Sequence, residues 1–228
     1  MLNGEQLIVE LLSKDCISTE KILKRAIVFG DSEAAHLMAG VRARFSKQGY
    51  AINQWTVPGC HAVDTLQNGP RCHEFYAVFM DRVLPEVQPS DVVIVSSRWI
   101  QLYNDIGSQA FEHSVSALFD ALKKTQAAIF IYGNTPDFTR SPQLIMVMQG
   151  IESRGDVFLT SKDFREVNAL LKREAEEYGF NFVNPANVFC EGADSLSCQV
   201  VKAGTHLFFD GGHLSAEGSV FLVNSDNR

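Results

Sequence analysis

Residues 25–37, which decide the fold, read Arg-Ala-Ile-Val-Phe-Gly-Asp-Ser-Glu-Ala-Ala-His-Leu. The apolar run at 26–29 is typical of a buried strand, and the apolar residues that follow recur at helical spacing. The stretch therefore predicts a strand, a tight turn at Gly30-Asp31-Ser32 and a helix. A serine at this place lies at or beside the helix N-terminus, where free backbone N–H groups favour a developing negative charge. Taken alone, the same turn is also compatible with an ordinary helix cap.

A second motif lies near the C-terminus, where residues 207–218 read Leu-Phe-Phe-Asp-Gly-Gly-His-Leu-Ser-Ala-Glu-Gly. Asp210 and His213 are three residues apart on a glycine-rich turn, so the carboxylate can reach the imidazole and fix its tautomer. A serine hydroxyl becomes an effective nucleophile when a base accepts its proton, and that base needs an orienting partner. We therefore expect Ser32, His213 and Asp210 to act as nucleophile, base and orienting acid.

Together these motifs make the chain resemble the SGNH (GDSL-type) hydrolase superfamily. Within it, the chain is most similar to the extracytoplasmic SGNH domains that are fused to acyltransferase-3 membrane proteins, which modify bacterial surface sugars. The resemblance spans roughly residues 25–218. It is carried by Gly30-Asp31-Ser32 with His36-Leu37, by Asp-Val-Val-Ile-Val-Ser-Ser-Arg-Trp at 91–99, and by Asp210-x-x-His213-Leu214-Ser215.

The resemblance implies serine-dependent O-acyl transfer, above all O-acetyl transfer, to a bacterial surface carbohydrate, or ester hydrolysis on such a carbohydrate. It implies no cofactor. The expected partners are a carbohydrate substrate, an acyl donor and a membrane acyltransferase domain in the same chain or another. A catalytically silent glycan-binding module with the same fold is the alternative. A flavodoxin-like nucleotide-binding or signalling domain is disfavoured, because the sequence has no glycine-rich phosphate loop.

The oxyanion donors are the least regular part of the resemblance. In the wider superfamily, a glycine after the second strand and an asparagine after the third assist the serine N–H. Gly59 could be that glycine, but Ser-Ser-Arg-Trp stands where the asparagine motif belongs. We therefore expect Arg98 or Asn134 to substitute. Trp99 could be a sugar-stacking platform or a core residue, and the sequence leaves both interpretations open.

Two residues on the first helix bear on the same site. Glu33 stands where the acyltransferase-linked domains usually carry a histidine directly after the serine. An ionised carboxylate facing the oxyanion would oppose catalysis, so we expect Glu33 to point outward. His36 is expected to pack beneath the site and not to serve as the base.

The five cysteines bear on the compartment. Cys60 and Cys72 bracket one short loop, and Cys190 and Cys198 bracket another. The spacing alone does not decide between two local disulfides and five reduced thiols in a cytoplasmic protein. The resemblance favours the pairs Cys60–Cys72 and Cys190–Cys198, with Cys16 left over. This implies a periplasmic or extracytoplasmic domain of a membrane protein. The Cys-His pairs at 60–61 and 72–73 lack zinc-ligand spacing, so no metal site is predicted.

Composition and patterning set the fold class. The chain has 228 residues, 46% of them hydrophobic, and a net charge of −7, which argues against nucleic acid as a partner. No run approaches the roughly 20 apolar residues that span a bilayer, and no signal peptide is visible. Disulfides would nevertheless require export from the cytoplasm, so we expect a longer natural product with membrane helices before this segment. Residues 1–24 are interpreted as a linker or peripheral helix, and residues 25–228 as one catalytic domain.

Five predicted strands alternate with helices along that domain. This order predicts an α/β protein, a three-layer α/β/α sandwich around a parallel, flavodoxin-like five-stranded sheet. Residues 139–160 are expected to be irregular and to form a packing or lid element. The strands are expected at 26–29, 50–57, 91–95, 127–132 and 180–183, and the later helices at 75–87, 111–122 and 162–178.

Overall fold

The computed structural model describes residues 24–65, 69–152, 154–192 and 194–225. The predicted N-terminal linker, apart from its last residue, and Cys16 lie outside the described residues. No helix in the described part of the chain is long and apolar enough to cross a membrane.

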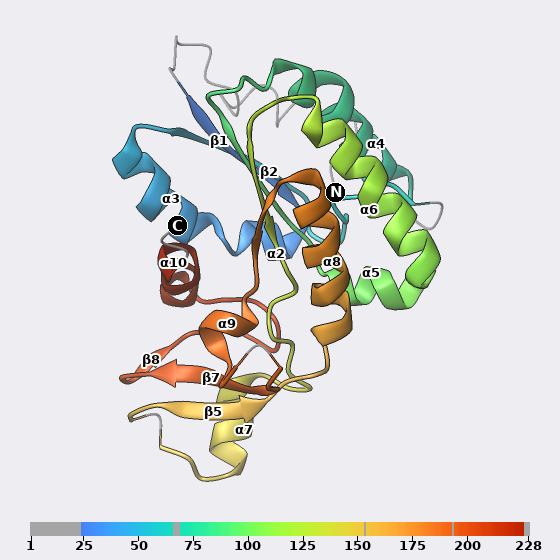
Figure 1. The fold of residues 1–228 in the computed structure, drawn as a ribbon. Helices are drawn as coiled ribbons and strands as arrows, with labels where there is room; N and C mark the ends of the chain where they lie inside the picture. Colours follow the sequence, from blue (N-terminus) through green and yellow to red (C-terminus); the bar gives the residue numbers. More distant parts are fainter. Residues whose placement is uncertain (1–23, 66–68, 153, 193, 226–228) are drawn as a thin grey trace.

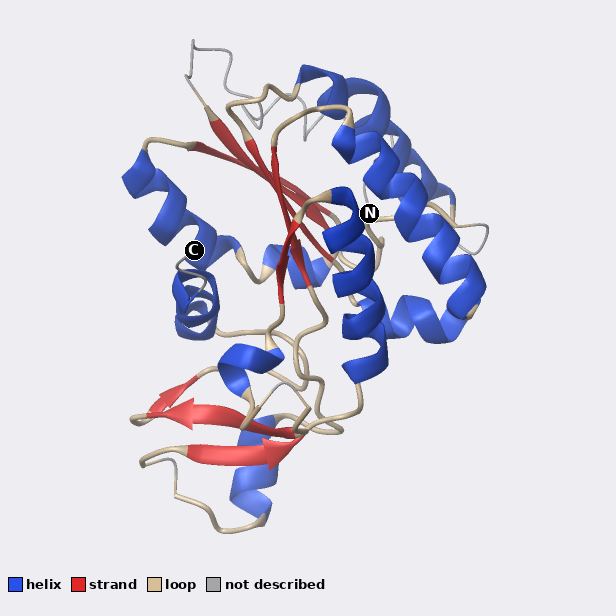
Figure 2. Cartoon of the chain, viewed as in Figure 1, coloured by secondary structure: helices blue, strands red, loops and turns tan. Residues whose placement is uncertain are grey.

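The centre of the fold is a parallel five-stranded sheet in the order β2-β1-β3-β4-β6 (Figures 1 and 2). All five residues of β3 are buried, as are five of the six in β1, because strands in the middle of a parallel sheet are covered on both faces. The predicted fold class and flavodoxin-like strand order are therefore confirmed. The strands are β1 (Arg25–Gly30), β2 (Ala51–Thr56), β3 (Val92–Ser96), β4 (Ala128–Tyr132) and β6 (Asn181–Val183).

Helices cover both faces of this sheet (Figure 1). One face carries α3 (Met38–Phe45) and α10 (Ala216–Ser225), which pack against each other; the other carries α4 (Pro70–Val78), α5 (Trp99–Ile106), α6 (Ser108–Lys123) and α8 (Arg165–Tyr178). The helix expected at 75–87 begins earlier, at Pro70, a residue favoured in the first helical turn. It ends in a π turn (η2, Phe79–Val83) and a 3-10 turn (η3, Leu84–Glu86), and a short 3-10 turn (η1, Ser46–Gln48) follows α3.

The expectation that residues 139–160 are irregular is wrong. They contain α7 (Pro142–Met148), whose N-cap Ser141 accepts a hydrogen bond from Leu144 N–H, and the strand β5 (Val157–Thr160). β5 pairs antiparallel with β7 (Ser197–Lys202), which also pairs with β8 (Thr205–His206). The partner strand of β5 lies almost 40 residues further along the chain, so local patterning does not reveal this small second sheet.

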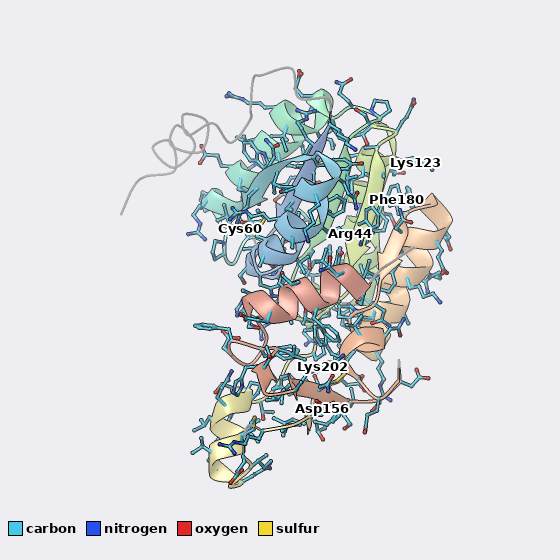
Figure 3. All side chains as sticks on the ribbon, turned by 90° about the vertical axis from the view of Figure 1, so that its left-hand side faces the viewer. Arg44, Cys60, Lys123, Asp156, Phe180 and Lys202 are labelled. Atoms are coloured by element: carbon cyan, nitrogen blue, oxygen red, sulfur yellow. A yellow bond between two sulfur atoms is a disulfide. The ribbon has the colours of Figure 1, made fainter. Side chains whose placement is uncertain are left out.

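The C-terminal helix α10 joins the second sheet to the main one (Figure 3). On one side, Arg44 of α3 donates from Nη1 to the carbonyl oxygen of Val223 at 2.9 Å. On the other side, Lys202 of β7 places its Nζ 3.9 Å from the ring centroid of Phe221. The cation contacts the aromatic face. Helix α10 is thus held to β7 of the second sheet on one side and to α3, which covers the main sheet, on the other. A short helix, α9 (Ala186–Phe189), lies beside it.

Both predicted disulfides are present. Cys60 and Cys72 have Cα atoms 5.0 Å apart, and Cys190 and Cys198 have Cα atoms 3.8 Å apart. The first bridge fastens α4 to the loop after β2. The second fastens the end of α9 to β7.

Gly30, at the end of β1, generates the first prediction. Its φ is +144°, and a Cβ at this position would lie 1.8 Å from the carbonyl oxygen of Ser96 on β3. Gly30→Ala must therefore push β1 and β3 apart, and we expect it to lower the free energy of unfolding by more than about 3 kcal/mol. Urea denaturation followed by circular dichroism measures the loss.

Gly107 provides the matched control. It also has a positive φ, +78°, but a Cβ there would meet no atom within 4 Å. Its ψ is 163°, so Gly107→Ala should cost only the strain of a backbone region that is essentially open to glycine alone, roughly 1–3 kcal/mol. Equal losses in the two variants would show that the close approach of β1 to β3 does not restrict residue 30.

Candidate active site

Ser32 begins α2 (Ser32–Ala35) directly beyond the carboxyl end of β1. The preceding Asp31 caps the helix, because its Oδ1 accepts a hydrogen bond from the N–H of Glu33 at 2.8 Å. The N–H of Ser32 donates to no group among the described residues. Ligands of open parallel sheets bind at this edge. The serine therefore sits with a free amide where an incoming carbonyl can approach.

Ser32, His213 and Asp210 lie in a hydrogen-bonded row. His213 Nε2 is 2.8 Å from Ser32 Oγ, and His213 Nδ1 is 2.8 Å from Asp210 Oδ2. The other oxygen of Asp210 accepts the backbone N–H groups of Gly212 and His213 at 2.9 and 2.8 Å. The row provides the geometry for proton transfer from the hydroxyl to the imidazole.

The charge of Asp210 fixes the tautomer of His213. Partial burial opposes ionisation, but the N–H groups of Gly212 and His213 and the imidazole outweigh it, so the pKa of Asp210 lies below its ordinary value. Asp210 is therefore an anion near neutral pH and holds a proton on Nδ1 of His213. Nε2 is left free to accept the proton of Ser32.

The loop that carries Asp210 and His213 is supported from the loop after β4. Phe138 N–H donates to the carbonyl oxygen of Gly211 at 2.5 Å, and Gln143 Nε2 donates to that of Phe208 at 2.5 Å. Within the loop itself, Phe209 N–H donates to the carbonyl oxygen of His213 at 2.8 Å. These contacts, one of them from the Gln143 side chain on α7, hold the base beside the nucleophile.

The carboxylate of Asp31 fixes the turn that carries Ser32, because it contacts the segments after β2 and β3. Its Oδ2 accepts hydrogen bonds from Ser97 Oγ at 2.7 Å and Arg98 N–H at 2.9 Å, and lies 3.1 Å from His61 Nδ1. Burial opposes the charge, but the bonds from His61, Arg98, Ser97 and Glu33 leave the pKa of Asp31 lowered. Sequence reasoning considered His61 only as a metal ligand, and did not single out Ser97. The sequence could have pointed to both residues through their positions, because His61 follows β2 and Ser97 follows β3 at the sheet edge that also carries Ser32.

Arg98 lies at the rim of the site with its charge partly exposed. Its Nη2 donates to Asp137 Oδ2 at 2.7 Å, and Lys162 Nζ lies 3.4 Å from the same oxygen. Burial disfavours the guanidinium charge, but the contact with Asp137 and the charge of Asp210 raise the pKa of Arg98. A fixed positive charge near the triad suits an oxyanion or a carboxylate.

The side chains of Trp99 and Asn134 are buried and bound to backbone groups. Trp99 is 0% exposed, and its indole N–H donates to the carbonyl oxygen of Tyr132 at 2.9 Å, so of the two open interpretations the structure supports the core residue and not the sugar-stacking platform. Asn134 is buried, with Oδ1 accepting from Ile100 N–H at 3.0 Å and Nδ2 donating to the carbonyl oxygen of Thr135 at 2.7 Å. Both ends of its amide are engaged by backbone, so Asn134 anchors α5; one Nδ2 hydrogen is left over, and the role of Asn134 as an oxyanion donor stays a prediction.

Gly59 lies on an exposed turn three residues after β2, with φ +77°. Its role as an oxyanion donor remains a prediction.

The expectation that Glu33 points outward is also wrong. Its carboxyl group is buried, with Oε1 3.8 Å from His213 Nε2 and Oε2 3.5 Å from His36 Nδ1. Burial, followed by the negative charges of Asp31 and Asp137, raises the pKa of Glu33 well above its ordinary value. His36 packs beneath the site as expected, with its side chain 4% exposed.

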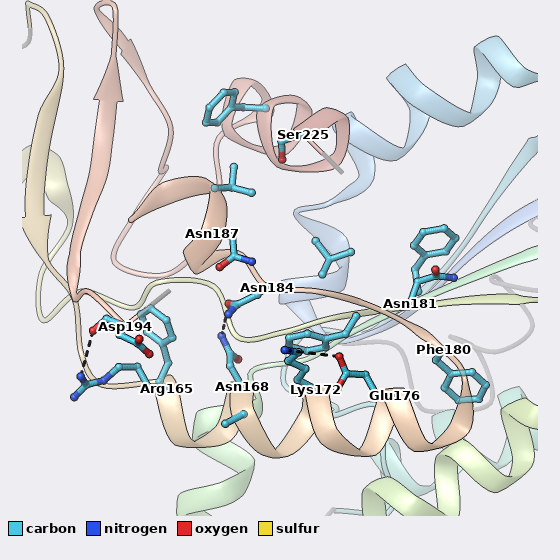
Figure 4. A pocket seen from close by; sticks show the side chains of 17 residues that line it. Arg165, Asn168, Lys172, Glu176, Phe180, Asn181, Asn184, Asn187, Asp194 and Ser225 are labelled. Carbon is cyan, nitrogen blue, oxygen red and sulfur yellow. Dashed lines mark hydrogen bonds and ion pairs between the residues drawn. The ribbon is translucent and has the colours of Figure 1, made fainter. Parts of the chain in front are cut away.

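A cavity of about 950 Å³ lies elsewhere, between α8, β6, α9 and α10 (Figure 4). Its walls include Asn168, whose Nδ2 donates to Asn184 Oδ1 at 3.0 Å, and the ion pair of Lys172 with Glu176 at 3.7 Å. No member of the triad lines it. The described residues include no group of three or more histidine, cysteine, aspartate or glutamate side chains that could hold a metal ion.

A parallel flavodoxin-like sheet with a serine after β1 and an Asp-x-x-His loop before the last helix defines an SGNH-type protein. The chain belongs to the family of SGNH domains fused to AT3 domains, whose family model matches residues 6–225. No curated protein matches the chain in sequence.

Solved structures share the fold. The periplasmic domain of a lipopolysaccharide acetyltransferase from Salmonella ser. Paratyphi A is 18% identical with a TM-score of 0.73, and the match covers 95% of this chain and 86% of that one. A GDSL-like lipase from Bacteroides thetaiotaomicron is 12% identical with a TM-score of 0.55 (97% and 94% covered). A catalytic mutant of an acetylxylan esterase from Geobacillus stearothermophilus is 15% identical with a TM-score of 0.51 (89% and 91% covered). At these identities the likeness concerns the fold alone.

The buried imidazole of His36 generates a prediction about stability. Burial, aided by the charge of His213, lowers the pKa of His36 from 6.5 to about 3. The unfolded chain binds a proton below pH 6.5 and the folded chain does not, so stability is lost as the pH falls from 6.5 towards 3, by about 3 kcal/mol at pH 4. Urea denaturation from pH 7 to 4 should show this loss in the wild type, and His36→Gln should lack it. Parallel pH profiles of the two proteins would contradict the neutral buried imidazole.

Proposed function

We propose that Ser32 carries out O-acyl transfer to, or ester hydrolysis on, a carbohydrate. The observation that carries the proposal is the pair of 2.8 Å contacts of His213, from Nε2 to Ser32 Oγ and from Nδ1 to Asp210 Oδ2. Membership of the SGNH family supports acyl transfer or ester hydrolysis in general. A silent glycan-binding module would not need a nucleophile, a base and an orienting acid in contact.

In the first half of the reaction, Ser32 Oγ attacks the carbonyl carbon of the acyl donor while His213 Nε2 takes its proton. The carbonyl oxygen becomes an oxyanion, which the N–H of Ser32 is placed to bind, with Gly59 N–H and the Arg98 guanidinium as further donors. The tetrahedral intermediate collapses when the bond to the leaving group breaks and His213 returns the proton to that group. The product is an acyl ester on Ser32.

In the second half, His213 removes a proton from a sugar hydroxyl or from water, and the resulting oxygen nucleophile attacks the acyl ester. The second tetrahedral intermediate expels Ser32 Oγ, which recovers its proton from His213. Asp210 stabilises the imidazolium in both halves. Electrons and protons balance without a cofactor.

Three observations support the finer assignment. The names of two structures with this fold refer to acetyl transfer to lipopolysaccharide and to acetylxylan esterase activity. The two disulfides are typical of an oxidising compartment, which supports a periplasmic or extracytoplasmic location. Fusion of SGNH domains to AT3 domains supports a membrane acyltransferase as the partner that delivers the acyl group.

The triad generates the central functional prediction. Ser32→Ala and His213→Ala should each lower kcat on a short-chain nitrophenyl ester or an acetylated sugar by at least about 10³-fold, because the three groups act as a unit. For the same reason the double variant should lose little more than either single one. Ser46→Ala, a substitution at an exposed serine on η1, is the matched control.

Full activity in Ser32→Ala would refute the assignment of the nucleophile. A wild-type protein that binds acetylated sugars but leaves every ester intact would favour the silent glycan-binding module.

A further inference from the structure

Glu33 lies against the catalytic base, on the side of its ring away from Asp210. Its Oε1 is 3.8 Å from His213 Nε2, the nitrogen that is 2.8 Å from Ser32 Oγ. Its Oε2 is 3.5 Å from His36 Nδ1. A Cβ on Gly212 would be 3.8 Å from Oε1, so the carboxyl group also borders the loop that carries the base. Glu33 therefore fills the space between two histidines.

The surroundings of Glu33 favour its uncharged form. Two anions face it, Asp31 from the turn before α2 and Asp137 from the loop after β4. The cation Arg98 favours the charged form, but it is already bound to Asp137 at 2.7 Å, and Lys162 lies 3.4 Å from the same Asp137 oxygen. A third carboxylate in this buried region would lack a partner of opposite charge, which is costly in a low-dielectric interior. The hydroxyl of Thr135 favours the charged form, but burial and the two anions outweigh it; the other described neighbours are the two histidines and, beyond His213, Asp210.

The hydrogen bonds around His36 agree with a proton on Glu33. His36 Nδ1 faces the N–H of Leu214 at 3.4 Å, so this nitrogen is an acceptor. Nε2 then carries the hydrogen, towards Thr135 Oγ1 at 3.5 Å. A carboxylic O–H at Oε2 of Glu33, 3.5 Å away, can share this lone pair with the Leu214 N–H, whereas an ionised Oε2 would face the Nδ1 lone pair with a lone pair of its own. Oε1 is then the carbonyl oxygen, and it faces His213.

We propose that Glu33 is a positioning residue for acyl transfer: as an uncharged carboxylic acid beside His36, it packs against the His213 ring and turns its carbonyl oxygen, 3.8 Å away, towards the Nε2–H that forms once His213 has taken the proton of Ser32. This inference rests on the proposed function. The carbonyl oxygen of the acid stabilises the imidazolium, and because the acid is neutral it does not repel the oxyanion that forms on the same side of His213. An ionised carboxylate at this place would stabilise the imidazolium but would destabilise the oxyanion.

Two substitutions at Glu33 separate the role of its carbonyl oxygen from that of its size. Glu33→Gln keeps the carbonyl oxygen and cannot ionise, and Glu33→Met keeps the length and removes the polar group. We expect Glu33→Met to lower kcat about ten- to hundred-fold with KM within about twofold, since a misplaced base slows the chemical step. Glu33→Gln should recover most of that loss. The assay uses a short-chain nitrophenyl ester, with kcat and KM measured separately.

The pH profile provides a readout that a merely structural role would not move. As the pH rises through the raised pKa of Glu33, the wild type should lose activity, because the carboxylate that forms opposes the oxyanion. Glu33→Gln should lack this alkaline decrease. The proposal is overturned if Glu33→Met matches the wild type, or if Glu33→Gln is as impaired as Glu33→Met.

The thermal stability of variants that carry Ser32→Ala tests whether Glu33 is uncharged. This test does not depend on catalytic activity. Above pH 4.5 the unfolded chain ionises Glu33 and the folded chain does not, so the folded state loses stability as the pH rises. The Tm advantage of Ser32→Ala/Glu33→Gln over Ser32→Ala should therefore grow between pH 4.5 and pH 8. A constant difference, or one that shrinks, would overturn the proposal. If the advantage grows but the wild type has no Ser32-dependent activity, the proposed function is at fault, and the positioning role is rejected with it.

Discussion

The arrangement of the site depends on the buried carboxylate of Asp31. It accepts hydrogen bonds from the N–H of Glu33, the hydroxyl of Ser97 and the N–H of Arg98, and it contacts His61. These donors come from the first turn of α2, the end of β3 and the loop after β2. One anion thereby fastens three segments around Ser32. A buried charge is tolerated when it is fully hydrogen-bonded, and these donors are what keep Asp31 ionised.

The base reaches the nucleophile by a separate route. Asp210 and His213 lie on a loop between the second sheet and α10, and that loop is supported by Phe138 and Gln143 from the segment after β4. The main sheet thus positions Ser32, whereas the segment after β4, which includes α7, positions His213. The 2.8 Å contact between Ser32 and His213 is the point where the two halves meet.

The parts of the site that sequence reasoning predicts are local ones. The apolar run of β1 followed by Gly30-Asp31-Ser32 predicts the strand, the turn and the helix, because each depends on neighbouring residues. Asp210 and His213 are three residues apart, so their contact also follows from the sequence. The strand order of the sheet follows from the alternation of strands and helices together with the family resemblance.

The parts that it misses depend on contacts between distant residues. β5 finds its partner β7 almost 40 residues later, and Trp99 is buried because α5 packs against α6. The error on Glu33 has an electrostatic origin. The expectation that it points outward assumes a charged carboxylate, and only the positions of Asp31, Asp137 and the two histidines show that the uncharged form can be buried.

The central claim is that Ser32 becomes acylated during turnover. Rapid mixing of the protein with a nitrophenyl acyl ester, acid quench and intact-protein mass spectrometry tests it most directly. We predict one acyl group per chain, located on Ser32 by peptide mapping and missing from Ser32→Ala. Hydrolysis of the ester with no adduct on Ser32, or an adduct that persists in Ser32→Ala, would contradict the account.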